Sequence, residues 1–144
     1  MSLSQVRTYF QQRIAVVEPD LIEHQDAFNF ANIPETQLDT RYHILYGSAA
    51  SSNKIDNHVE DLFPITVTIW RRAFNSENET LDALMDVAHC IRMDAIDFEN
   101  IETFGMDLLD VNATSITPSP IDDSNDNIIQ VQIEFNVRLS FGFN

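Results

Sequence analysis

The sequence predicts a single domain of the α+β class, in which two helices cover one face of a mostly antiparallel or mixed sheet of four to five strands. From Ile129 to Phe143 every odd position is apolar and every even position is polar or glycine, as in a strand with one buried face. Two segments, near residues 2–17 and 76–96, instead repeat apolar residues every three to four positions, as helices do. The predicted order along residues 1–144 is helix, strand, strand, helix, strand, strand.

The composition is strongly acidic. The 144 residues include 8 Lys+Arg and 23 Asp+Glu, which gives a formal charge of −15 at pH 7. This charge opposes attraction to phosphate backbones and to anionic membrane surfaces. No apolar run reaches the length of a membrane span, and the N-terminus lacks a continuous apolar signal segment. We therefore expect a soluble cytoplasmic protein that binds neither membranes nor nucleic acid stably.

The first half of the chain predicts one helix and two strands. Ser2 and Gln5 have capping-box spacing, and Pro19 marks the end of the first helix. Residues 20–39 show no clean period and predict an irregular connection that holds three apolar side chains in the core: Phe28, Phe30 and Ile33. Residues 41–46 (RYHILY) then predict a strand rich in β-forming residues.

A small, polar loop is predicted between the two strands. Gly47–Asn57 (GSAASSNKIDN) has no period, so we expect a flexible segment that is available for binding. The strand that follows, LFPITVTIWRRAF, places four apolar residues on one face: Phe63, Ile65, Val67 and Ile69. Pro64 lies near the start of this strand, where a missing backbone donor is tolerated.

The second half predicts a helix and a hairpin. Ser76 and Glu79 form a capping-box pair at the start of the helix. Residues 101–117 alternate less cleanly and predict one strand or two short ones, with Gly105 as a β-bulge. Residues 118–127 (PSPIDDSNDN) are rich in turn-forming residues and predict an elongated hairpin tip before the final strand.

Catalytic and metal-binding patterns are absent from the sequence. The four histidines, His24, His43, His58 and His89, lack metal-ligand spacing, and we expect His43 and His89 to be packing residues. The lone Cys90 lies in an apolar repeat, so we expect a small buried side chain rather than a nucleophile.

Neither the acidic clusters nor the glycine positions complete a known metal-binding, phosphate-binding or nucleophile motif. Asp123 to Glu134 has the spacing of a calcium loop, but Ile128 occupies the position that requires glycine. The run DAIDFEN at residues 94–100 is interpreted as a solvated helix end. With three glycines in the chain there is no phosphate-binding loop, and no Gly-x-Ser-x-Gly sequence occurs. We expect a protein without cofactors that is not an enzyme.

The order and character of the segments resemble the tail terminator, or tail-completion, proteins of long-tailed bacteriophages, the group that includes the lambda minor tail protein U. The resemblance rests on five segments that together cover nearly the whole chain: the opening helix SLSQVRTYFQQRIAVV, the strands RYHILY and FPITVTIWRR around a polar loop, the capped helix SENETLDALMDVAHCIRM, and the closing strand IQVQIEFNVRLSFGF.

This resemblance implies a structural virion protein of the tail, assembled in the cytoplasm of the bacterial host. Such a protein forms a hexameric ring that caps the tail tube, stops polymerisation of the tube protein and presents a docking face to the head connector. It also implies that DNA passes through the ring without specific binding, which fits a lumen lined by carboxylates. The long final strand is then expected to reach a neighbouring subunit's sheet.

Long polar loops and an aromatic residue beside two arginines are the predicted contact regions. The expected subunit or partner contacts are Ser51, Asn53 and Lys54 in the first loop, Trp70, Arg71 and Arg72 on the strand, and Asp122, Asp123 and Asp126 in the hairpin tip. Ordinary solvated turns explain the loops as well, and Trp70 could equally pack under a helix while the arginines neutralise nearby carboxylates within the subunit.

Two other functions stay open at this point. A neck or head–tail connector adaptor, one layer away in the particle, needs the same kind of small acidic α+β subunit. A small-ligand-binding module of the same architecture would instead have an enclosed apolar pocket with a few convergent polar groups.

Overall fold

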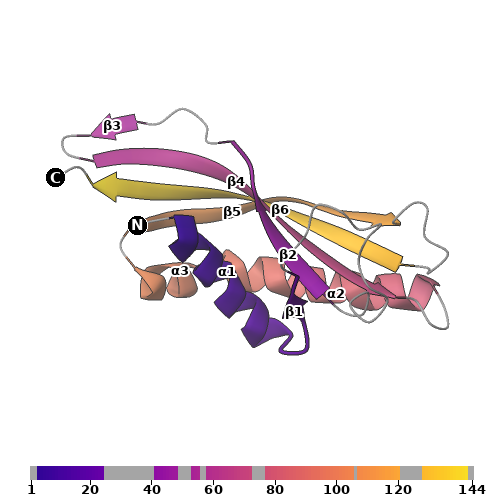
Figure 1. The fold of residues 1–144 in the computed structure, drawn as a ribbon. Coiled ribbons are helices and arrows are strands. Elements are labelled where there is room, and N and C mark those ends of the chain that lie inside the picture. Colours follow the sequence, from indigo (N-terminus) through magenta and orange to yellow (C-terminus); the bar gives the residue numbers. More distant parts are fainter. Residues whose placement is uncertain are drawn as a thin grey trace.

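The computed structural model describes residues 3–24, 41–48, 53–55, 58–72, 77–105, 107–120 and 128–142. In this part of the chain the elements follow in the order α1 (Leu3–Val17), β1 (Ile22–Glu23), β2 (Arg41–Tyr46), β3 (Asn53–Ile55), β4 (His58–Arg72), α2 (Glu77–Ala95), α3 (Phe98–Phe104), β5 (Leu108–Pro120) and β6 (Ile128–Gly142). The helices lie on one face of a single sheet (Figure 1). The predicted α+β class is confirmed.

The two longest strands form the centre of the sheet. The strand order is β1-β2-β4-β6-β5, with β3 also paired to β4. β4 and β6, each 15 residues long, pair antiparallel along their whole length, from His58 opposite Gly142 to Arg72 opposite Ile128. The other pairs are antiparallel too, except β1 with β2, which is parallel. The long alternating strand is thus a central strand of a mixed sheet.

The helix-covered face carries the hydrophobic core. The odd residues of β6 from Ile129 to Leu139 are buried, as their alternation predicted. They meet the odd residues of β4 and the apolar stripes of the helices, which include Val6, Phe10, Ile14, Leu84, Ala88 and Ile91. The ring of Phe10 lies 5.0 Å from the ring of Phe135, which joins α1 to the middle of the sheet. Each large apolar side chain buried here contributes roughly 1.5–3 kcal/mol.

A short third helix occupies a segment that the sequence pattern assigned to a strand. The Asp97 side chain accepts a hydrogen bond from the Glu99 N–H, so it caps the start of α3. Gly105 ends the helix with φ 157° and ψ 159°, a conformation that residues with a Cβ rarely adopt. The predicted bulge at Gly105 is therefore wrong. The bulges lie farther on, between Leu108 and Asp110 and between Ala113 and Ser115.

Part of the predicted polar loop is a strand. Asn53–Ile55 forms β3, which pairs with the start of β4, and β4 itself begins at His58 rather than at Leu62. Only two residues join Ile55 to His58, and they are Asp-Asn, a pair typical of tight hairpins. Three residues are too few to show the alternation of a strand in the sequence. Pairing with β4 therefore determines the conformation of this stretch.

Gly47, the residue after β2, lies very close to β4. Its N–H donates to the carbonyl of Pro64 at 2.7 Å. A Cβ at residue 47 would lie 2.5 Å from Cγ of Pro64, so the site accepts only glycine without rearrangement. The predictions for Phe28, Phe30 and Ile33 and for the hairpin tip at 121–127 lie outside the described residues.

Two side chains of α2 lie on the solvent side instead of in the core. Cys90 and His89 are exposed, in contrast to the packing roles predicted for them. The buried stripe of α2 runs through Leu84, Ala88, Ile91 and Ala95. At 100° per residue, positions 89 and 90 turn away from that stripe, and the Arg92 guanidinium instead contacts the His89 Nδ1 at 2.7 Å.

Phe135 provides a direct test of the inward face of β6, because only 1% of its surface is exposed. Phe135→Ala should lower the free energy of unfolding by about 3–5 kcal/mol, since it leaves a cavity beside Phe10. Gln132→Ala, on the opposite face, should change it by less than about 0.5 kcal/mol. Urea unfolding followed by circular dichroism measures both values. Equal effects of the two substitutions would show that the inward face of β6 is misassigned.

Candidate assembly surface

The predicted contact residues do not come together in one site. Lys54 and its neighbour Asn53 lie on β3, beside the start of β4, and Trp70, Arg71 and Arg72 end the same long strand. Ten residues separate Glu60, which pairs with Asn53, from Trp70, a distance of roughly 33 Å along a strand. The remaining predicted residues lie outside the described part of the chain: Ser51, Asp122, Asp123 and Asp126.

Trp70 is buried within the subunit. None of its surface is exposed, and its ring meets the ring of His24 edge to face at a centroid distance of 5.5 Å. Thr68 and His43, which are partners across the β2–β4 ladder, are buried beside it on the sheet face opposite the helices. Trp70 is therefore buried, as the packing alternative predicted, but it does not lie under a helix, and it is not part of the surface of a single chain.

Arg71 and Arg72 are half-buried, and they lie opposite Ile129 and Ile128 at the start of β6. Their guanidinium groups belong to opposite faces of the sheet, because neighbouring residues of a strand alternate. A contact role for these two arginines stays a prediction.

His43 is the titratable residue of the buried group that it forms with Thr68 and Trp70. Burial lowers the pKa of His43 below its ordinary value, and the positive charges of Arg7 and His24 lower it further, while Glu23 opposes them. The neutral imidazole is thus favoured in the folded chain, whereas the unfolded chain takes up a proton near pH 6.5.

The contribution of His43 to the free energy of unfolding should therefore be fully present above about pH 6.5. It should fall as the pH drops below that value, because the unfolded state then binds more protons. The loss attributable to His43 approaches about 1.4 kcal/mol per pH unit until its folded-state pKa is reached. His43→Asn should remove this part of the slope. Urea midpoints between pH 7.5 and 5 measure it, and identical slopes for both proteins would contradict the assignment.

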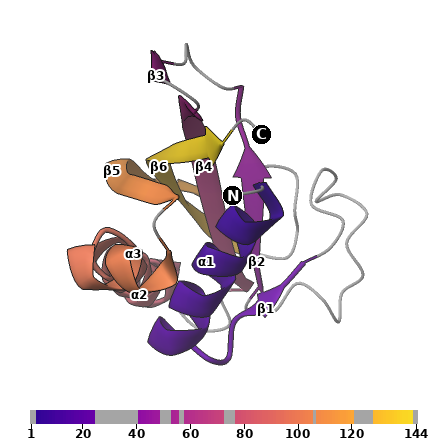
Figure 2. The same ribbon diagram turned by 90° about the vertical axis from the view of Figure 1, so that its left-hand side faces the viewer.

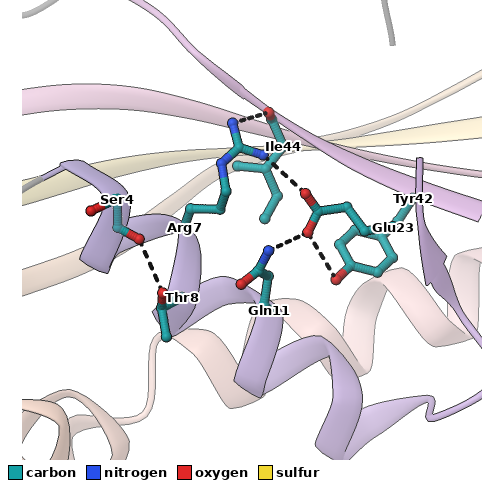
Figure 3. A network of polar contacts seen from close by, with 7 residues as sticks. All are labelled: Ser4, Arg7, Thr8, Gln11, Glu23, Tyr42 and Ile44. Carbon is teal, nitrogen blue, oxygen red and sulfur yellow. Dashed lines mark hydrogen bonds and ion pairs between the residues drawn. The ribbon is translucent and has the colours of Figure 1, made fainter. Parts of the chain in front are cut away.

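A polar network closes the β2 edge of the sheet (Figure 3). Arg7 of α1 makes an ion pair with Glu23 of β1 at 3.1 Å, and its second terminal nitrogen donates to the carbonyl of Ile44 at 3.4 Å. The side chains of Gln11 and Tyr42 also donate to the Glu23 carboxylate. Burial, and then the negative charge of Glu23, raise the pKa of Tyr42 to about 12. Helix α1 thus fixes β1 against β2. Its Arg7 side chain also occupies the Ile44 carbonyl on the outer side of β2.

The opposite edge, β5, is protected differently. Its ladder with β6 is interrupted by two register shifts, and it ends at Pro118–Pro120, where two prolines lack backbone donors. Bulges and prolines are common means of preventing an edge strand from pairing with another chain. Both lateral edges of the sheet are therefore poorly suited to strand addition.

One end of the sheet extends beyond the helices. Figure 1 shows β3, the start of β4 and the end of β6 reaching past α1 and α3, and Figure 2 shows the same separation from another side. We call residues 53–55, 58–63 and 137–142 the projecting end; its innermost apolar residues, Phe63, Val137 and Leu139, still belong to the core. Leu62, on the face without helices, is 36% exposed there. The sequence indicated this end only through the unusual length of its last strand.

Charge is distributed unevenly between this end and the helices. The projecting end contains two basic and two acidic residues: Lys54, Arg138, Glu60 and Asp61. The solvent side of α2 and α3 instead carries a row of exposed carboxylates: Glu79, Asp82, Asp86, Asp97, Glu99 and Glu102. The charges of the projecting end sum to zero, although Asp107 and Asp110 lie beside the same part of β6.

A cavity of about 330 Å³ lies between α1 and α3. Its lining residues are Tyr9, Gln12, Arg13, Asn100, Thr103 and Phe104. Several polar groups of this lining bond within the chain: the Tyr9 hydroxyl donates to the Ala95 carbonyl, and the Asn100 amide donates to the Asp94 carbonyl. Arg13 pairs with the Asp94 carboxylate at 3.6 Å. Since Tyr9, Arg13 and Asn100 use their polar groups within the chain, the cavity gives little support to a ligand-binding function.

Within the described residues, no group of three His, Cys, Asp or Glu side chains is placed to hold a metal ion. No helix in this part of the chain has the length and apolar character needed to cross a membrane.

Comparison with known proteins yields a likeness in fold. No protein-family model matches the sequence, and no curated protein matches it either. Among solved structures, the chain is similar to one in a structure described as "Virion of native gene transfer agent (GTA) particle". The two share a TM-score of 0.56 and 10% sequence identity, over 92% of each chain. At this identity the likeness shows a common fold.

Proposed function

We propose that this protein is a structural component of a phage-like virion that forms a hexameric ring at the end of a tail tube. The ring stops polymerisation of the tube protein and presents a face on which the head connector docks. The observation that carries the proposal is the fold shared with a chain of a virion particle along 92% of both chains. A match of this extent concerns the whole domain, so it agrees with the resemblance in segment order to tail terminator proteins.

The charge distribution supports a role next to DNA without binding it. A ring must let DNA pass, and carboxylates repel phosphate groups. The exposed acidic row on α2 and α3 suits a surface that faces passing DNA, while the projecting end has no net charge and suits contact between subunits. In this proposal the protein acts by assembly in the host cytoplasm, has no cofactor and catalyses no reaction.

A neck or connector adaptor is the second candidate, because the same fold likeness supports any ring-forming layer of the particle. The distinction is functional. A terminator limits the length of the tube, whereas an adaptor binds a finished tube or the head without affecting polymerisation.

The proposal predicts that this protein limits tube growth. Tube protein from the same particle should give shorter tubes when polymerised with this protein than without it, and electron microscopy should show added density at one end. An unrelated acidic protein at the same concentration is the control. Tubes of unchanged length with bare ends would contradict the terminator function, and density on tubes of unchanged length would favour the adaptor.

A further inference from the structure

The projecting end has two strand edges that no described strand covers. β3 lies on one side of β4, and its other side has no partner strand among the described residues. On the opposite side, β5 begins opposite Leu139, so the last residues of β6 extend past it. Both edges are short and lie at the same end of the molecule (Figure 1).

The hydrogen-bond pattern shows which backbone groups lie along the β6 edge. The N–H of Ser140 donates to the carbonyl of Asp107, just before β5, at 2.9 Å. Backbone groups of successive residues in a strand point to alternate sides. The backbone N–H and C=O of Phe141 therefore point towards β4, where Phe141 lies opposite Val59. Gly142 directs its N–H and C=O away from β4.

The same reasoning applies to β3. Pro64 accepts a hydrogen bond from Gly47, so the even residues of β4, including His58, direct their backbone groups towards β2 and β3. Ile55 lies opposite His58, and its backbone N–H and C=O point towards β4. Lys54, the next residue along, directs its N–H and C=O outward. The outward-facing residue is thus the middle one of β3 and the last one of β6.

We propose that the β3 edge of one copy pairs with the Gly142 edge of β6 in the next copy. This inference rests on the proposed ring and names the contact that closes it. β3 and β6 are both antiparallel to β4, so they run parallel to each other, and the rotation of about 60° between neighbours in a six-fold ring keeps the two strands closer to parallel than to antiparallel. The contact is a short parallel ladder between two different edges, a head-to-tail arrangement that closes into a ring.

Charge and edge protection both favour this contact over the alternatives. The projecting end has as many basic as acidic residues in a chain of charge −15. The lateral edges are occupied by the Arg7–Glu23 network on one side and interrupted by bulges and prolines on the other. Among the described sheet edges, β3 and the end of β6 are therefore the least obstructed for strand pairing between copies.

Cysteine cross-linking tests the contact. In a Cys90→Ser background, Ile55→Cys and Gly142→Cys, which lie opposite each other on one face of the proposed parallel ladder, should form disulfides between subunits and give a ladder of linked chains up to the hexamer on non-reducing gels. A disulfide within one chain is excluded, because β4 separates the two positions by about 9.5 Å, beyond the roughly 7 Å limit between Cα atoms. Each single cysteine variant is the matched control and should give nothing larger than a dimer.

Proline substitution provides a second measurement. Gly142→Pro and Lys54→Pro each remove an outward N–H while leaving the ladder with β4 intact, so the subunit should fold with an unchanged circular dichroism spectrum. Each should at least halve the ring fraction in light scattering. The controls Gly142→Ala and Lys54→Ala retain the N–H and should form rings as the unmodified chain does.

The outcomes separate this contact from the proposed function. Rings that persist in the folded proline variants, or that yield no cross-linked ladder, would overturn the contact while leaving ring formation in place. A chain that is monomeric at every concentration, alone and with tube protein, and that gives no ladder would overturn both the contact and the ring.

Discussion

The antiparallel ladder between β4 and β6 is the interaction on which the rest of the structure depends. Its register places every odd residue of both strands on one face, so one slip of a single residue would expose the whole apolar row. The helices have an apolar surface to cover only because this register holds. The same ladder is longer than the helix layer, so its outermost residues extend past the helices.

Edge protection determines where this sheet can meet another chain. Arg7 and Glu23 hold β1 over one edge, and bulges and prolines interrupt the other. These features prevent lateral association of a sheet whose central strands are rich in β-forming residues. The projecting end lacks them, so the proposed pairing between copies would find available backbone groups there. Assembly can then proceed by strand pairing without a large apolar patch on the free subunit.

Sequence periodicity predicted the elements that bury a continuous stripe, namely α1, α2, β4 and β6, because burial imposes the period directly. It missed α3, since seven residues make barely two turns and the capping Asp97 decides their conformation. It also missed β3, whose three residues are ordered by pairing with β4. Among the predicted contact residues, Trp70 is buried because a distant residue, His24, packs against it, and local sequence contains no sign of such a contact.

The mass of the purified protein across a wide concentration range, measured by light scattering and accompanied by negative-stain images, tests the central claim most directly. The proposed ring predicts a species of about six times the 16.5 kDa of one chain, with six-fold symmetry in the images, either alone or on tube ends. A strict monomer or dimer that forms no rings even with tube protein would contradict it, and the cavity between α1 and α3 would then become the first site to test for ligands.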